Sequence, residues 1–267
     1  LKVYPHDLAD YEDAGDFQEQ GHEEEADAGL GGHERQHHLR VQHGHSQQEQ
    51  HGHGPHHHGL HSALGGEGVE PLLDADATLP AAACLVYDRA GRRVGRYDKI
   101  HLFDVTLPGD GESYRESATI RAGRAPLLID TPCGRLGIAV CYDLRFPELF
   151  RDLQSGGADG FAVPAAFTAQ TGRAHWEILV RARAIENLGY VLAAAQSGNH
   201  PGSRQTYGNS LIVDAWGEIL GRAPDGEGVV LAQLDLQKQT QIRERFPALA
   251  HRIGGAGLTT NNDHGEK

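Results

Sequence analysis

The sequence has no methionine, only two tryptophans and only three cysteines among its 267 residues. Because Cys84, Cys133 and Cys141 cannot pair evenly, the cysteine count argues against a disulfide scaffold and favours a reducing compartment. No apolar run approaches the ~20 residues of a membrane span, and no charged segment followed by an apolar one opens the chain. These absences predict a soluble, cytoplasmic protein with no membrane partner. The chain begins with Leu1 rather than Met, which predicts a fragment or an uncertain gene start.

Negative charge is concentrated in one part of the chain. Residues 1–80 carry 16 acidic and three basic side chains, a net charge of −13, whereas the other 187 residues carry 21 of each sign. The acidic excess therefore belongs to a single segment. It argues against a nucleic-acid partner for either part of the chain.

The composition of residues 1–80 predicts disorder. Residues 7–29 are acidic, and residues 33–61 are a tract of His, Gln and Gly that holds most of the 18 histidines. Neither segment has a helical or strand period of apolar residues, so neither buries enough surface to offset the loss of chain entropy. Three interpretations stay open: a tail that binds Zn, Ni or Cu through its imidazoles, a solvated tail without a task, or a translation of the wrong reading frame.

From about residue 81 the sequence changes to short apolar runs bounded by Gly, Pro, Asp or Asn. Runs of four to eight residues with such boundaries predict strands, and several lack the alternation of half-exposed strands, which is typical of strands covered on both faces. The predicted strands are residues 82–87, 126–129, 136–141, 160–164, 190–195, 210–213 and 229–234.

Three helices are predicted between and after these strands, over residues 147–154, 175–188 and 236–245. The middle helix is expected to bury one apolar stripe, formed by Ile178, Leu179, Ala182, Ile185 and Leu188. Strands that alternate with helices and then follow one another indicate an α/β sandwich. We expect this domain to span residues 81–253, with a flexible tail over residues 254–267.

The segment Val-Cys-Tyr-Asp-Leu-Arg-Phe-Pro-Glu, which contains Cys141, is the most informative for chemistry. A strand that ends at a cysteine, followed by a turn and a helix, lifts the side chain out of the sheet. Helix N-terminal amides then point at the thiol and lower its pKa from ~8.5. Such a turn is the cysteine counterpart of the nucleophile elbow in serine hydrolases. The alternative is that Cys141 is a small buried apolar residue, which is the usual position of a free cysteine.

A second motif, Asp-Lys-Ile-His-Leu-Phe-Asp, places Lys99 in an apolar segment 42 residues before Cys141. Together the two motifs resemble the nitrilase, or carbon–nitrogen hydrolase, superfamily over about residues 82–253. Within it, the chain is most similar to the amidases that act on deaminated glutathione and to the ω-amidases. Further matching motifs lie at residues 164–167, 175–177, 181–187 and 207–210.

The resemblance implies an α-β-β-α sandwich and a Glu–Lys–Cys triad that hydrolyses a linear amide without a metal or an organic cofactor. Cys141 would attack the amide carbonyl and form a thioester, and a glutamate would move the protons. Lys99 and the backbone N–H of Tyr142 would stabilise the oxyanion. The resemblance also implies a homo-oligomer.

The triad glutamate cannot be located in this sequence. The resemblance places it at a strand end well before Lys99, where the chain has Glu23, Glu24, Glu25 and Glu34 but no strand pattern. The N-terminal portion of the sandwich is therefore expected to be missing or replaced by the disordered segment, leaving the chain poorly folded and nearly inactive. Glu116 matches the superfamily's second glutamate, which supports the lysine and the cysteine loop; the alternative is a surface carboxylate.

Three functions stay open on these grounds. The first is an amidohydrolase for a small carboxylated amide, the second a catalytically inactive family remnant that binds or scaffolds, and the third a His-rich metal buffer. A substrate carboxylate would favour arginine, which makes bidentate contacts with a permanent charge. The candidate arginines are Arg145, Arg173 and Arg204.

Overall fold

A computed structural model describes residues 79–108, 112–200, 204–223, 226 and 228–253, and the backbone of residues 2–6 and 38–42. Its centre is a six-stranded sheet in the order β14-β13-β10-β9-β8-β7. Strands β8, β9 and β10 are parallel, whereas β7, β13 and β14 run antiparallel to their neighbours. The bounds are β7 Leu127–Thr131, β8 Gly134–Ile138, β9 Gly160–Ala165, β10 Tyr190–Ala195, β13 Leu211–Val213 and β14 Ile219–Arg222.

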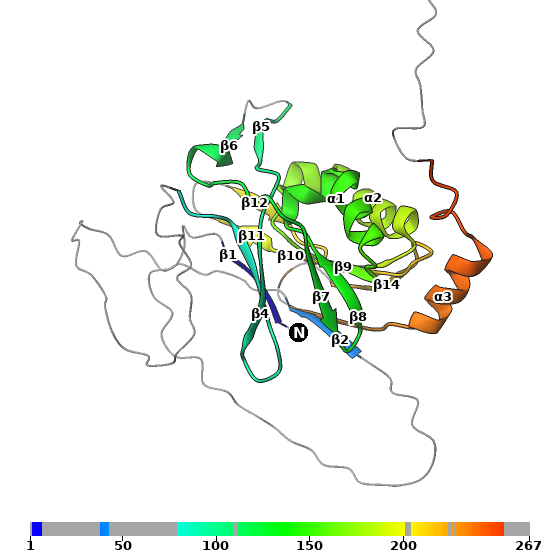
Figure 1. The fold of residues 1–267 in the computed structure, drawn as a ribbon. Helices are drawn as coiled ribbons and strands as arrows, with labels where there is room; N and C mark the ends of the chain where they lie inside the picture. The colour runs from blue at the N-terminus through cyan, green and yellow to red at the C-terminus, as the bar shows by residue number, and fades with distance from the viewer. Residues whose placement is uncertain are drawn as a thin grey trace, which may run out of the picture.

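Two helices cover one face of this sheet, α1 (Pro147–Ser155) and α2 (Ala169–Asn187) (Figure 1). The parallel strands carry apolar side chains on both faces, so both faces need a covering layer. Phe161 and Val191 point to the helices, and Phe150 of α1 meets Phe161 edge to face. A third helix, α3 (Leu236–Arg245), is capped at its N-terminus by Asp235, whose side chain accepts a hydrogen bond from the Lys238 backbone N–H.

A second, smaller sheet lies on the opposite side, in the order β1-β3-β4, with β1 Lys2–His6, β3 Ala83–Tyr87 and β4 Arg93–Asp98 (Figure 1). Cys84, Val86 and Tyr97 of this sheet belong to the same buried apolar cluster as Ile138 of β8. Shorter pairs complete the fold: β5 (Asp104–Thr106) with β6 (Ser113–Arg115), β11 (Ser197–Asn199) with β12 (Gln205–Tyr207), and β15 (Val229–Gln233) with β2 (His38–Gln42).

The layers are therefore helices, six-stranded sheet and second sheet, which confirms the predicted α/β sandwich. Among the described residues, no helix covers the outer face of β3 and β4. Each of the seven predicted strands is present, with bounds that differ by up to three residues, and the largest difference is that β8 ends at Ile138, whereas the sequence predicts a strand up to Cys141. The strands β4, β5, β6, β11, β12 and β14 are not among the predicted ones.

Helix α2 differs from its prediction in its start and in its buried face. It begins at Ala169, six residues early, because Thr168 caps it by accepting a hydrogen bond from the Thr171 backbone N–H. The predicted apolar stripe is wrong, since Ile178 and Ile185 are 68% and 47% exposed. The helix buries a face that includes two polar side chains, which hydrogen bonds make compatible with burial. The buried residues are Gly172, Trp176, Val180, Arg183, Ala184 and Asn187.

Most of residues 1–80, for which the sequence predicts disorder, lie outside the described residues. Two strands of that segment are described, β1 antiparallel to β3 and β2 antiparallel to β15. Both add to the edges of strands from the later part of the chain. An edge strand offers free backbone N–H and C=O groups, so a segment without an apolar pattern can pair there.

We expect Gly172→Ala to lower the free energy of unfolding by about 1–3 kcal/mol through overpacking. An added Cβ would lie 2.2 Å from the Cβ of Tyr207 and push α2 away from β12. Gly228→Ala is the control, because nothing lies within 4 Å of its added Cβ. Urea unfolding checks the prediction, and equal midpoints for the two variants would contradict it.

Candidate active site

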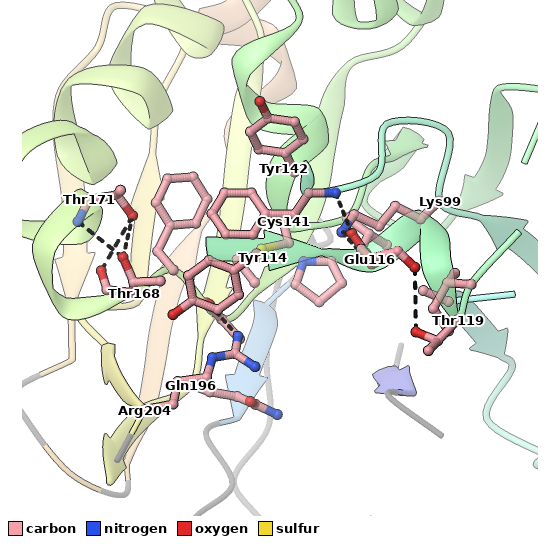
Figure 2. Close-up of a pocket in the computed structure, with 18 of the residues that line it drawn as sticks. Lys99, Tyr114, Glu116, Thr119, Cys141, Tyr142, Thr168, Thr171, Gln196 and Arg204 are labelled. Atoms are coloured by element: carbon pink, nitrogen blue, oxygen red, sulfur yellow. Dashed lines mark hydrogen bonds and ion pairs between the residues drawn. The ribbon is translucent and has the colours of Figure 1, made fainter. Parts of the chain in front are cut away.

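A pocket of about 550 Å³ lies between the two sheets and is open to one side. Its wall comes from six parts of the chain: the start of β3, the end of β4, the segment around β6, the turn after β8, the end of β9 with the start of α2, and the segment between β10 and β12. Figure 2 shows Cys141 at its centre, with Lys99 and Glu116 on one side and Thr168 and Thr171 on the other. The pocket thus collects most of the side chains that the sequence singles out.

Cys141 has an uncommon backbone conformation. Its φ is +50°, in the left-handed region that residues other than glycine rarely adopt. It follows the extended residue Val140 and opens a 3₁₀ turn, Cys141–Arg145, after which α1 begins at Pro147. The predicted elbow is present, but a 3₁₀ turn rather than an α-helix follows the cysteine.

The buried carboxylate of Asp143 holds this turn against the second sheet. Its Oδ2 accepts hydrogen bonds from the Val140 backbone N–H at 2.9 Å and from the Tyr97 hydroxyl at 2.8 Å. Its Oδ1 accepts one from the His101 backbone N–H at 3.0 Å and lies 2.7 Å from His101 Nδ1. The His101 ring stacks on Phe146 with centroids 3.7 Å apart. One side chain therefore fixes the cysteine turn to the segment that carries Lys99.

Lys99 is 4% exposed and bound to Glu116. Its Nζ donates to Oε1 at 2.8 Å and Oε2 at 2.5 Å of Glu116, and Oε2 also accepts the Phe103 backbone N–H at 2.5 Å. The Lys99 backbone N–H donates to the carbonyl of Ala82, the residue before β3, at 2.8 Å. Glu116 is thus a partner of Lys99 inside the pocket and not a surface carboxylate.

The pKa of the Cys141 thiol is raised above its ordinary value, mainly because burial disfavours the thiolate. The positive charge of Lys99, the backbone amide of Ala166 and the charge of Arg204 act in the opposite direction, and Glu116 raises the pKa further. This corrects the sequence-based expectation of a lowered pKa. The short 3₁₀ turn does not supply enough positive potential to offset the loss of water.

The other predicted site residues fall into two groups. Tyr142, Arg145 and Arg204 line the pocket. Arg173 lies exposed on α2 and is not part of the pocket wall, so the structure does not bring it to Cys141.

Glu116 is the one carboxylate among the described residues that line the pocket. Glu23, Glu24, Glu25 and Glu34 lie outside the described residues, so the described part of the chain places no carboxylate other than Glu116 beside the thiol. Within the described part of the chain, no cluster of three His, Cys, Asp or Glu side chains is suited to a metal ion. No described helix is long and apolar enough to cross a membrane.

Sequence reasoning assigned no role to Asp143 or His101, although both belong to the two motifs. The available signal was an aspartate two residues after the cysteine in an otherwise apolar segment. A buried aspartate needs several donors, and backbone donors cannot be read from residue types.

Residues 55–244 match the carbon-nitrogen hydrolase family. A deaminated glutathione amidase of Yersinia enterocolitica is 46% identical over 185 residues, which cover 69% of this chain and 65% of that protein. The Homo sapiens deaminated glutathione amidase is 42% identical over 195 residues, covering 73% of this chain and 59% of that protein. The chain therefore spans less than two thirds of the length of these relatives.

Solved structures give the same relationship. The crystal structure of the C. elegans NitFhit protein has a TM-score of 0.62 at 44% identity and covers 67% of this chain and 43% of that one. Saccharomyces cerevisiae Nit3, described as a member of branch 10 of the nitrilase superfamily, has a TM-score of 0.59 at 32% identity, covering 66% of this chain and 60% of that one.

We expect iodoacetamide to label Cys141 faster than Cys84 or Cys133. Cys84 is fully buried, and burial raises its pKa to about 12; Cys133 is buried at the turn between β7 and β8. Because the Cys141 pKa is raised and only the thiolate reacts, its labelling rate should rise about tenfold per pH unit below that pKa. Peptide mass spectrometry over pH 6–9 measures these rates, and faster labelling of Cys133 would sink the assignment.

Asp143→Asn should lower the free energy of unfolding by about 1–3 kcal/mol, because an amide nitrogen would face donors that now bind a carboxylate oxygen. The same variant should change the Cys141 labelling rate, since the turn loses its contact with the segment of Lys99. Asp130→Asn is the matched control, as Asp130 is an exposed partner of Arg135. If both variants unfold at the same urea concentration, the role of Asp143 is wrong.

Proposed function

The chain belongs to the carbon-nitrogen hydrolase family, and from this premise we propose that it hydrolyses an amide of a small carboxylated substrate, of the deaminated glutathione type, through a thioester on Cys141. One observation carries the proposal. Cys141, on a left-handed backbone in the turn after β8, shares its pocket with the Lys99–Glu116 ion pair.

In the first half of the reaction, Sγ of Cys141 attacks the amide carbonyl carbon. The C–N bond breaks, the nitrogen leaves as ammonia or an amine after it takes up a proton, and a thioester remains. Negative charge develops on the carbonyl oxygen during this step. The Nζ of Lys99, which is buried and held by Glu116, is the charged donor for this oxygen, and the backbone N–H of Tyr142 is the second.

In the second half, water attacks the thioester, the carboxylic acid leaves and the thiol is restored. Both halves need a group that accepts and returns a proton, and such transfer typically contributes ~10²–10⁴-fold in rate. Glu116 already accepts hydrogen bonds from Lys99 and Phe103, so we give it the role of holding Lys99. The triad glutamate stays unassigned.

A second candidate function is a catalytically inactive binding or scaffold protein. The raised pKa of Cys141 favours it, together with the absence of an uncommitted carboxylate from the described pocket wall. A binding protein would use the same pocket and take up the same carboxylated amide without breaking its C–N bond. Homo-oligomer formation and a cytoplasmic location remain predictions.

Ammonia release from glutaramate, a five-carbon monoamide with one carboxylate, separates the two functions. We expect slow release by the full chain, because no base is assigned to its thiol, none by Cys141→Ala, and a further decrease of about 10²–10³-fold for Lys99→Met, the range seen when an oxyanion donor is removed. Lys99→Arg should also lose activity, because the planar guanidinium group of arginine does not fit a site shaped for the compact ammonium group of lysine.

The control is Lys238→Met, which removes a half-exposed lysine of α3 that lies outside the pocket. Its turnover should match that of the unchanged chain. Full activity of Lys99→Met would contradict the proposed role of Lys99. Binding of glutaramate with no ammonia release by the unchanged chain would establish the second candidate.

A further inference from the structure

The described wall of the pocket carries more positive than negative charge. Four cationic side chains line it, Lys99, Arg115, Arg145 and Arg204, against the single carboxylate of Glu116. A concave site with charges of mostly one sign attracts ligands of the opposite sign. The pocket is therefore suited to an anionic ligand.

Three of the four cations are already engaged or lie at the surface. Lys99 is bound to Glu116. Arg145 has its Nη1 3.3 Å from His175 Nδ1, and its guanidinium lies over the rings of Phe167 and Tyr142 at 5.4 and 5.9 Å. Arg115 is exposed on β6.

Arg204 differs from these three. Its Nη2 donates to the Ala166 carbonyl at 3.1 Å, which fixes the guanidinium against the pocket wall. Its Nε is buried and has no acceptor among the described residues, and no described carboxylate forms an ion pair with it. The backbone is fixed as well, since the His200 N–H donates to the Arg204 carbonyl at 2.8 Å between β11 and β12.

Ala166 connects this arginine to the reacting atom. Its carbonyl accepts the hydrogen bond from Arg204, while its backbone amide lies against the sulfur of Cys141. Figure 2 shows Arg204 next to Gln196 and below Tyr114, on the same side of the pocket as both, with Cys141 above them. A short molecule can therefore reach the sulfur with one end and the guanidinium with the other.

We propose that Arg204 binds the substrate's carboxylate, so that the pocket selects amides whose chain carries a carboxylate at the end remote from the scissile carbonyl. The inference deepens the proposed amidase function and rests on it for the position of the amide. A guanidinium that is fixed in place and not neutralised binds a carboxylate with little loss of side-chain entropy. Arg145, although it lines the same pocket, is not the anchor.

Equilibrium binding to the full chain tests this assignment without turnover. Isothermal titration calorimetry in a Cys141→Ala background compares glutaramate with glutaramide, its neutral diamide of equal length. We expect glutaramate to bind at least tenfold more tightly than glutaramide. Adding Arg204→Gln should remove the preference, whereas adding Arg145→Gln should leave it in place. Arg204→Lys keeps the charge but not the planar guanidinium, so it should retain part of the preference. This variant is the control for a glutamine variant that fails to fold.

A preference that survives Arg204→Gln, or no preference in the Cys141→Ala chain, would overturn the proposal. The two proposals fail separately. If the preference depends on Arg204 but the unchanged chain releases no ammonia, the amidase function is wrong and the anchor stands. If ammonia is released from both amides with equal kcat/KM by the unchanged chain and by Arg204→Gln, the anchor is wrong and the amidase function stands.

Discussion

The carboxylate of Asp143 is the constraint on which the site depends. It takes hydrogen bonds from Val140 in the turn after β8 and from Tyr97 and His101 at the end of β4, so it joins the two sheets at one buried point. Cys141 lies in that turn and Lys99 in that second segment. Without this link the nucleophile and the cation would belong to two layers that meet here through apolar contacts, which position side chains less strictly than directional hydrogen bonds do.

Burial has two opposing effects in this pocket. It raises the pKa of Cys141 and so lowers the fraction of reactive thiolate, but it also strengthens the attraction between Lys99 and a developing oxyanion. The positive charges of Lys99 and Arg204 both act to lower the pKa of Cys141 and so favour its thiolate form. The same positive charge that favours an anionic substrate thus also favours the ionised nucleophile, which links substrate recognition to reactivity.

Much of the fold could be predicted from the sequence, and parts of the site could not. Strand β10 and helix α3 have the predicted bounds. Residues typical of turns or helix caps mark the ends of both elements, and such residues can be read from the sequence. The buried face of α2 was missed, because Arg183 reaches the core by donating to the Leu144 carbonyl. The arginines could not be told apart from the sequence for the same reason. Arg145 and Arg173 are equally good candidates there, and the tertiary fold places Arg145 in the pocket and Arg173 on the surface.

The central claim is that Cys141 becomes acylated by a carboxylated amide, and trapping the acyl-enzyme tests it most directly. The full chain is mixed with glutaramate, quenched in acid within seconds and analysed by peptide mass spectrometry. The account predicts a glutaryl thioester on the peptide that contains Cys141, removed by hydroxylamine and absent from Cys141→Ala. Because no described carboxylate next to the thiol is left to activate water, the adduct should accumulate. An unmodified Cys141 in a chain saturated with glutaramate would contradict the account.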